Sequence, residues 1–527
     1  MARLNTKTSK PRKGATKLAT TGARTVNHQG GVGVLREERT ELFLAAVTSL
    51  NEDTFYESAK DRRGRIATLI EAVSEDTEWI LGLVTWLRKE AGLRTIPSII
   101  AAHAVHHRLE SGHHGSNRAI ISAALGRADE NSELLAYWLE TFGRTVPSAV
   151  KRGVADSFLK GLNQSSYLKW RGKASRGAVS MVDVINLTHP KPTTPEQVRL
   201  LKFIVDEAYG NELDYSGLDI LRERDEFLSW DKATQIKVLS SGQANAVIRS
   251  ASLTHEVIAG AIGVIPAEVW ENLIPHMGYK ALRMNLRRIH ESGVSDSTID
   301  RINDRLKDAE TIRRSNPMPL EFLAAYRNAP LDFAPAIQRA ANFTLENVPA
   351  LKGRTLILVD TSASMSYDNL SARSTLTRLE GARVFGAALA IKAVNPTLVT
   401  FGTESGEVNV KGKDLLRVAE SIPNLASGTA TQRAIDKHFD GHDRVIVITD
   451  EQPGYAGYWG TRSGDVFENI PTNVPTFTWN LAGYRTGHSE IKVNRYTFGG
   501  LTDKGFQMIP LLEAGLNQGW PWENDSK

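Results

Sequence analysis

The stretch from Thr355 to Ser366 constrains the fold more than any other part of the chain. An uninterrupted apolar run, Leu356–Val359, ends abruptly in Asp360, and the hydroxyl side chains of Ser362 and Ser364 follow at close spacing. Apolar runs without alternation are typical of strands that are buried on both faces of a parallel sheet. Ligands of open α/β sheets bind beyond the carboxyl ends of such strands. The stretch therefore predicts a parallel-sheet domain with a ligand site at Asp360.

Two later segments would bring further oxygen ligands to the same end of the sheet. The loop Ser427–Thr431 contains two threonines, and the apolar run Val445–Ile448 is followed by Thr449 and Asp450. With the Asp-x-Ser-x-Ser pattern, these segments resemble the metal-ion-dependent adhesion site of von Willebrand factor A domains. The resemblance implies Asp360 and Asp450 as anchors of a divalent cation, with Ser362, Ser364 and Thr429, or Thr431 as the alternative threonine, as direct or water-mediated ligands. Hard oxygen donors favour Mg²⁺, with Mn²⁺ and Ca²⁺ as alternatives, over zinc.

Length and composition exclude several classes of protein. A chain of 527 residues is too long for one ordinary core, so two or three domains are expected. The absence of cysteine excludes a disulfide framework, a thiolate zinc site and thiol catalysis. No stretch approaches the length of an apolar membrane span, and the first residues lack the apolar core of a signal peptide. We therefore expect a cytoplasmic protein with no membrane partner.

Positive charge is concentrated in the first 28 residues. Seven Lys or Arg residues and no acidic residue occur in 1–28, whereas the whole chain has a formal net charge of only +4. With little apolar periodicity, this segment is predicted to be a disordered basic tail. Such a tail is either simply solvated or adds sequence-independent attraction to phosphates.

The rest of the chain changes its hydrophobic rhythm near residue 346. Up to that point the pattern is helical with short connections, which predicts an α-solenoid of HEAT-like repeats. Helices are expected at Glu37–Leu50, Arg65–Val73, Thr77–Glu90, Ile96–Arg108, Ser132–Thr141, Ser148–Leu162, Pro195–Tyr209, Thr234–Leu239, Thr254–Ile262, Pro266–Leu273, Gly278–His290 and Ser297–Lys307. After it, strands and helices alternate, which predicts a doubly wound α/β domain. The predicted domains are 1–28, 29–345 and 346–527.

A second resemblance covers most of the chain. Its landmarks are Asn27–Gly31, Arg94–Pro97, Lys169–Lys173, Asp183–Pro192, Leu282–Arg288 and Met318–Tyr326. In this order they resemble a TROVE domain, and a TROVE domain followed by a von Willebrand A domain is the architecture of the Ro autoantigen family, here a bacterial or phage member. The resemblance implies a ring of HEAT-like helical repeats closed by the von Willebrand A domain. It also implies a monomeric RNA-binding scaffold for RNA quality control, not an enzyme and not a DNA-binding protein. Its expected ligands are Y-like small noncoding RNA and misfolded RNA with single-stranded ends, and an exoribonuclease is a candidate partner.

The same resemblance supplies candidate RNA-binding residues. The predicted set is Lys169, Arg171, Lys173, His189, Lys191, Arg283 and Arg287. Lys and Arg suit phosphates, and a histidine can donate to a phosphate or a ribose hydroxyl. Arg283 and Arg287 lie one helical turn apart, where ordinary solvated helix charge is the alternative. Trp170 is expected to pack against a neighbouring helix rather than stack on a base.

Three other readings of the sequence compete with RNA binding. A metal-dependent protein-adhesion module without RNA is the main alternative. A metal-dependent hydrolase is the weakest, because the dense carboxylates of a two-metal site are missing. The histidines at 103, 106, 107, 113 and 114 suggest zinc, but no glutamate separates His103 from His107 as in His-Glu-x-x-His, and no third ligand is nearby. They are expected to be core or surface histidines.

Overall fold

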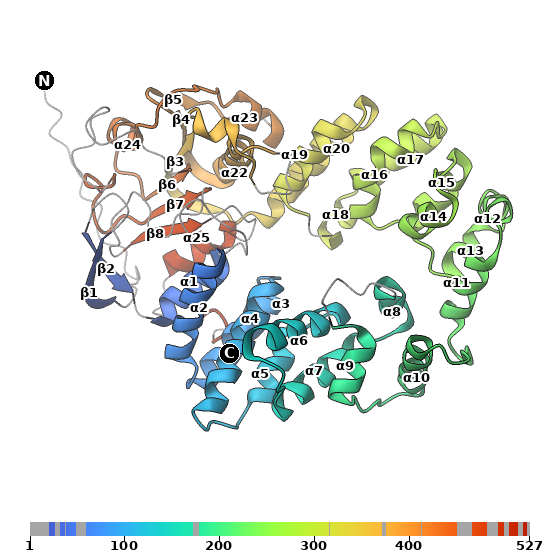
Figure 1. Cartoon of the computed structure of the whole chain (residues 1–527). Coiled ribbons are helices and arrows are strands. Elements are labelled where there is room, and N and C mark those ends of the chain that lie inside the picture. Colours follow the sequence, from blue (N-terminus) through green and yellow to red (C-terminus); the bar gives the residue numbers. More distant parts are fainter. Residues whose placement is uncertain are drawn as a thin grey trace, which may run out of the picture. The chain divides into compact units, whose positions relative to one another are not determined.

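A computed structural model of the chain describes residues 20–26, 32–36, 38–48, 59–171, 179–315, 317–370, 376–412, 414–450, 466–481, 494–499, 505–514 and 520–523 (Figure 1). The chain forms two compact units. The helical unit is the continuous segment Ile70–Asn303, and the sheet unit combines residues 1–69 with residues 304–527. This division differs from the boundary predicted at residue 345/346, because the helices just before the first sheet strand pack on the sheet domain.

The helical unit consists of short helices that contact their second neighbours along the chain. Helix α3 contacts α5, α5 contacts α7, and α7 contacts α9. In the same way α4 contacts α6, α11 contacts α13, α13 contacts α15, and α12 contacts α14. This alternation is the pattern of a solenoid of stacked helix pairs. The helices are α3 (Thr77–Lys89), α4 (Thr95–Glu110), α5 (Asn117–Ala124), α6 (Ala128–Phe142), α7 (Ser148–Gly161), α8 (Gln164–Trp170), α9 (Met181–Thr188), α10 (Pro195–Tyr209), α11 (Asp219–Ser229), α12 (Lys232–Leu239), α13 (Ala244–Ser250), α14 (His255–Ile262), α15 (Ala267–Leu273), η1 (Ile274–His276) and α16 (Tyr279–Glu291). The predicted α-solenoid is confirmed, and α5, α8, α9, α11 and α13 lie outside the helix ranges expected above.

Helices α2 (Ala59–Val73) and α17 (Asp296–Leu306) lie where the two units divide. The sheet unit has further helices before, between and after the strands of its six-stranded sheet. They are α1 (Glu38–Thr48), α18 (Ala309–Ser315), α19 (Pro319–Asn328), η2 (Leu331–Phe333), α20 (Ala334–Phe343), η3 (Thr344–Asn347), α21 (Ser364–Tyr367), α22 (Arg378–Lys392), α23 (Leu415–Ser421), α24 (Thr431–His438) and α25 (Gly505–Ala514). Helix α19 packs on α22, and Arg327 forms an ion pair with Glu380 between them. This packing explains why residues 304–345 belong to the sheet unit.

Six strands form the sheet in the order β5-β4-β3-β6-β7-β8. They are β3 (Leu351–Asp360), β4 (Ala393–Phe401), β5 (Ser405–Val408), β6 (Arg444–Thr449), β7 (Thr476–Asn480) and β8 (Arg495–Gly499). All neighbours are parallel except the edge strand β5. The chain winds from β3 to one side and then returns to the other, so the topological switch point lies between β3 and β6. Doubly wound sheets bind ligands at this point, and the predicted α/β domain is confirmed.

Alternate side chains of each strand point to opposite faces of the sheet. Because residues 355–360 of β3 and all residues of β6 are buried without alternation, helices pack on both faces. Leu356 and Leu358 pack with Ala434 and Ile435 of α24. On the other face, α22 approaches β3 so closely that a Cβ on Gly386 would lie 2.5 Å from Cγ2 of Val359. Only glycine therefore permits this helix-to-sheet distance.

A two-stranded antiparallel sheet precedes α1. Strand β1 (Thr20–Val26) pairs with β2 (Val32–Arg36). The prediction of a disordered tail over 1–28 is therefore wrong for residues 20–26, because their Thr-rich sequence pairs with the alternating apolar residues of β2. Residues 1–19, and the landmark Asn27–Gly31, lie outside the described residues.

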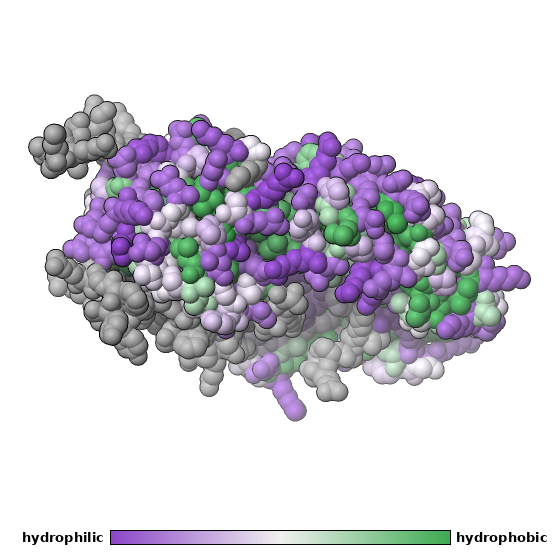
Figure 2. Space-filling model, turned by 90° about the horizontal axis from the view of Figure 1, so that it is seen from above, coloured by the Kyte–Doolittle hydropathy of each residue, from purple (hydrophilic) through white to green (hydrophobic). Residues whose placement is uncertain are grey.

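The described surface has scattered rather than concentrated hydrophobic residues. Figure 2 shows hydrophobic groups separated by hydrophilic side chains on the visible face. The exposed large hydrophobic residues include Val264 between α14 and α15, Met284 in α16, Leu331 in η2 and Tyr367 in α21. Single exposed residues of this kind are normal on protein surfaces. Among the described helices, none has the length and hydropathy needed to cross a membrane.

Candidate metal centre and RNA-binding residues

Two buried carboxylates stand at the switch point of the sheet. Asp360 ends β3 and Asp450 follows β6, and both side chains are fully buried. Oγ1 of Thr449 donates to Oδ2 of Asp360 at 2.5 Å, and the backbone N–H of Ser362 donates to Oδ1 at 2.9 Å. Because adjacent parallel strands end side by side, the two aspartates predicted from separate motifs meet at one sheet edge.

Hydroxyl groups surround these carboxylates. The hydroxyl oxygens of Ser362 and Ser364 are 3.2 Å apart. Backbone hydrogen bonds from Ala363 to Ser427, at 2.9 Å, and from Ala426 to Thr361, at 3.0 Å, join the loop after β3 to the loop before α24. That second loop contains the buried residue Thr429. The structure therefore joins the loops that contain all the hydroxyl residues of the predicted cation site.

The electrostatics of this sheet edge suit a cation. Burial, and then the charge of Asp450, raise the pKa of Asp360 above its usual range. Thr431, the alternative threonine, is buried, and its Oγ1 has no hydrogen-bond partner within the described part of the chain. A hard divalent cation would offset the repulsion between the carboxylates and accept oxygen ligands. The residues present therefore fit such an ion.

Arg378 is a residue of this region that sequence reasoning missed. Its Nη1 lies 3.8 Å from Oδ2 of Asp450 and 2.8 Å from Oδ2 of Asp368. The guanidinium is mostly buried, so it supplies a permanent positive charge beside Asp450. No motif marks Arg378, because it lies in the first turn of α22 and reaches the carboxylates only through the fold.

Three exposed basic side chains lie at the ends of α8 and α9 in the helical unit. His189 caps α9 with a left-handed backbone, φ 47°, and its N–H donates to the carbonyl of Ile185. Both His189 and Lys191 are exposed. Lys169, also exposed, is at the end of α8, with its Nζ 5.7 Å from the Trp170 ring. Helices α8 and α9 both contact α6.

This chain is similar to a known protein family in sequence and to a known protein in structure. The TROVE domain family matches residues 264–377. The crystal structure of the Ro (RSR) protein of Deinococcus radiodurans aligns with 92% of this chain and 100% of its own length, at a TM-score of 0.69 and 15% sequence identity. The chain has the fold of this Ro protein. No curated protein sequence matches it. The TROVE match and the shared fold confirm the resemblance found in the sequence, and the identity is low enough that each site residue has to be judged from its own surroundings.

Arg171 has a different role in this chain from the one predicted. Its guanidinium forms ion pairs with Glu207 of α10 and with Asp225 of α11, the latter at 2.5 Å between Nη1 and Oδ1. Tyr167 donates to the same Glu207. Two carboxylates already satisfy the guanidinium, so Arg171 joins three helices and is removed from the predicted RNA-binding set.

The predicted arginine pair of α16 is also corrected. Arg283 is buried, with only 6% of its surface exposed, whereas Arg287 is exposed and pairs with Glu291 at 3.1 Å. Residues one turn apart share a helix face only approximately, and here the core boundary separates them. Arg283 is therefore not available to RNA. Lys173 lies outside the described residues.

The histidines of α4 have the structural roles expected for them. His103 bonds to the Tyr137 hydroxyl at 2.7 Å, His107 bonds to the Ser74 hydroxyl at 2.8 Å, and His106 stacks on Phe142. Burial, and then the charge of His106, lower the pKa of His103 to about 4. Within the described ranges, no cluster of three or more His, Cys, Asp or Glu side chains could hold a metal ion.

Proposed function

We propose that this protein binds structured small noncoding RNA, with Y-like RNA as the ligand class, through exposed basic residues around the end of α9. The observation that supports this most directly is the exposure of two basic side chains at the end of α9. The left-handed C-cap at His189 ends the helix there. His189 is exposed with φ 47°, and Lys191 is exposed two residues later.

The chemistry of these residues favours RNA phosphates and riboses. An imidazole donates to a phosphate oxygen or exchanges a hydrogen bond with a 2′-hydroxyl, which distinguishes RNA from DNA. Lys169 and Lys191 add point charges that attract phosphates without reading sequence. The proposed site therefore recognises the shape and backbone of a folded RNA more than its sequence.

We further propose a scaffolding role in RNA quality control, with misfolded RNA as a second ligand and an exoribonuclease as a candidate partner. The support is the Ro-type architecture together with the chemistry of the sheet edge. Two carboxylates and several hydroxyls suit holding one cation but not two-metal hydrolysis. Binding by a monomer, without catalysis, is the proposed activity.

A divalent cation at the sheet edge is a second proposal, and Mg²⁺ is its favoured identity. Asp360, Asp450, Ser362, Ser364 and Thr429, or Thr431, would hold it. The ion would supply a positive charge able to attract a carboxylate of a partner protein. Exposed Tyr367 in α21, three residues from Ser364, adds an aromatic contact surface. This pairing supports the alternative function, a metal-dependent protein contact.

The RNA proposal is tested with His189→Ser/Lys169→Ala/Lys191→Ala in a gel-shift titration against a structured small RNA. Three partly exposed, charge-assisted contacts at about 1 kcal/mol each should together weaken binding roughly a hundredfold. Circular dichroism should show unchanged helicity, because none of the three side chains is buried.

The matched control is Lys232→Ala/Lys237→Ala. Both lysines are exposed on α12 and have no ion pair among the described residues, so this variant removes a comparable charge elsewhere in the helical unit. It should bind RNA almost as tightly as the wild type. A folded triple variant that binds as well as this control would contradict the proposed site.

A further inference from the structure

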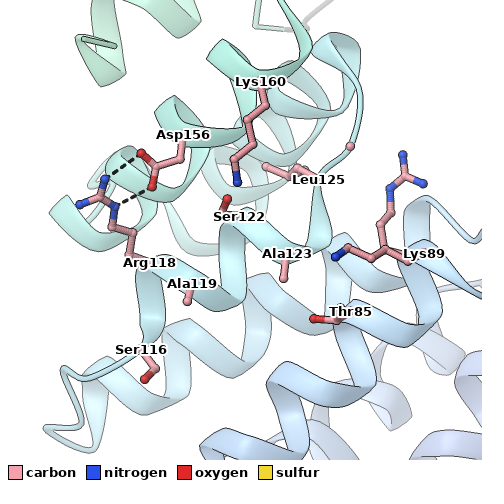
Figure 3. A pocket seen from close by; sticks show the side chains of 12 residues that line it. Thr85, Lys89, Ser116, Arg118, Ala119, Ser122, Ala123, Leu125, Asp156 and Lys160 are labelled. Carbon is pink, nitrogen blue, oxygen red and sulfur yellow. Dashed lines mark hydrogen bonds and ion pairs between the residues drawn. The ribbon is translucent and has the colours of Figure 1, made fainter. Parts of the chain in front are cut away.

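A groove on the helical unit, apart from the residues around His189, has the chemistry of an anion site. It has a volume of about 1010 Å³ and lies between α3, α5 and α7 (Figure 3). Four cationic side chains and one carboxylate line it, namely Arg88, Lys89, Arg118, Lys160 and Asp156. A concave surface with one predominant sign of charge concentrates ligands of the opposite sign.

Two of the four cations are available to a ligand. Arg88 is held by Glu130, with Nη2 to Oε1 at 2.9 Å, and Arg118 is held by Asp156 at 2.6 and 2.7 Å. Lys89 and Lys160 are exposed and form no ion pair within the described residues. Figure 3 shows their ammonium groups pointing into the groove from α3 and α7, on either side of α5. Two unpaired charges therefore face each other across one channel.

The floor of the groove consists of small side chains. Ala119, Ser122 and Ala123 of α5 form it, and α7 packs closely on α5 because residue 153 is glycine. A Cβ at Gly153 would lie 2.7 Å from the carbonyl oxygen of Arg118. Leu125 is the single large aliphatic side chain of the lining, and the aromatic anchors that dominate protein–protein contacts are missing from it. Its lining instead suits a polar, anionic chain.

We infer that this groove binds the phosphodiester backbone of a double-stranded RNA segment. The inference rests on the proposed RNA-binding function and adds a second, sequence-independent contact to it. No aromatic residue lines the groove, so it cannot stack the unpaired bases on which single-strand recognition depends. A duplex keeps its bases stacked internally and presents phosphates and 2′-hydroxyls, which Lys89, Lys160 and the Ser122 hydroxyl can contact.

The test measures fluorescence anisotropy with a labelled blunt-ended RNA duplex and with one of its strands alone, over a series of salt concentrations. Lys89→Ala/Lys160→Ala should weaken duplex binding about tenfold and reduce the slope of log K against log salt by about two. The affinity for the single strand should fall by less than about threefold, which is about half a logarithmic unit of the dissociation constant. Lys232→Ala/Lys237→Ala is again the control with equal charge loss.

A second variant should move affinity in the opposite direction. Asp156→Asn releases Arg118 and removes the only carboxylate of the lining, so duplex binding should tighten severalfold. The inference is overturned if Lys89→Ala/Lys160→Ala binds the duplex like its control, or if duplex and single strand weaken equally. It is also overturned if Asp156→Asn leaves duplex affinity unchanged.

Failure of the proposed function gives a different result. In that case the folded His189→Ser/Lys169→Ala/Lys191→Ala protein keeps its affinity for structured RNA, whatever the groove variants do. If the wild type binds none of these RNAs, both proposals are wrong. Capture of an acidic peptide by the groove, without duplex binding, would replace the inferred ligand with a protein.

Discussion

Individual buried charges decide the properties of the sheet edge. Asp360 and Asp450 lie without solvent exposure at neighbouring strand ends, and Nη1 of Arg378 lies 3.8 Å from Oδ2 of Asp450. The same guanidinium is also paired with Asp368. Two buried carboxylates at adjacent strand ends repel each other, and a bound cation would offset this repulsion.

Asp360→Asn tests this proposed cation site. Asparagine keeps the size of the side chain and an oxygen that can accept from the Ser362 N–H, but it removes the anionic anchor. Calorimetric titration should show Mg²⁺ binding to the wild type and none to the variant. Without metal, the variant should be at least as stable as the wild type, because one of two buried like charges is gone. Asp440→Asn, on an exposed loop, is the control, and Mg²⁺ binding by Asp360→Asn equal to that of this control would refute the assignment.

Protonation of His442 should make the sheet unit sensitive to acid. His442 is buried, accepts a hydrogen bond from the N–H of Asp440 and bonds to Oγ1 of Thr397 at 3.0 Å. Burial, and then the charge of Arg354, lower its pKa to about 4. The folded state therefore holds the neutral ring, and its stability falls as the pH drops from about 6.5 towards 4, since the unfolded chain takes up the proton first.

Urea denaturation at pH 7 and pH 5 measures this effect. His442 should account for a loss of about 2 kcal/mol in the free energy of unfolding between these pH values. His442→Gln removes the titrating group, so its loss between pH 7 and pH 5 should be smaller by that amount. His103 adds a similar effect to the helical unit, and His103→Gln tests it separately. An equal loss in His442→Gln and the wild type would show that His442 does not titrate as described.

At the scale of helices, close approach is set by single glycines. Helix α7 reaches α5 because Gly153 has no side chain, and this pair forms one wall and the floor of the groove. Gly260 lies inside α14 with no other atom within 4 Å of a Cβ placed there. The two glycines therefore have different physical roles although both are helical.

Alanine substitution should separate these roles. Gly153→Ala should destabilise the helical unit by about 1–3 kcal/mol, because the methyl group collides with Ile121 and the backbone of Arg118. Gly260→Ala should stabilise it by about 0.5–1 kcal/mol through helix propensity. Thermal denaturation followed by circular dichroism compares them. Equal shifts of the two melting temperatures would show that α5 and α7 are not packed as closely as described.

At the scale of the whole molecule, charge is divided unevenly along the chain. Residues from 351 onward contain 18 basic and 19 acidic residues, whereas the first 28 contain seven basic residues and none acidic. Because Thr20–Val26 form β1, the tail that can be removed without cutting a strand is 2–19. It contains Arg3, Lys7, Lys10, Arg12, Lys13 and Lys17.

Deletion of residues 2–19 should weaken RNA binding without changing discrimination between RNAs, since phosphate contacts read no sequence directly. The slope of log K against log salt should become shallower by the number of tail charges that contact phosphate. Titrations of two different structured RNAs at several salt concentrations check this. If truncated and full-length proteins have the same slope, the tail is solvated and takes no part in binding.

Local patterns were enough to predict the classes of structure. The uninterrupted apolar run before Asp360 identified a buried parallel strand, and helical periodicity identified the solenoid, because burial of one face leaves a regular pattern in the residues. The motifs at Asp360 and Asp450 also indicated one site, since parallel strands end at the same edge. Short charged helices such as α11 were missed, because their apolar residues are too few to show a period.

Contacts between distant charges were decided by tertiary structure alone. Arg171 looks like a phosphate ligand in the sequence, yet its neighbours in space are Glu207 and Asp225, from two other helices. Arg283 is buried while Arg287 is exposed, and the groove of Lys89 and Lys160 exists only where α3, α5 and α7 meet. Periodicity shows which face of a helix is apolar. It does not show which helices become neighbours, and the neighbours determine whether a positive side chain is neutralised by a carboxylate or left to bind an anion.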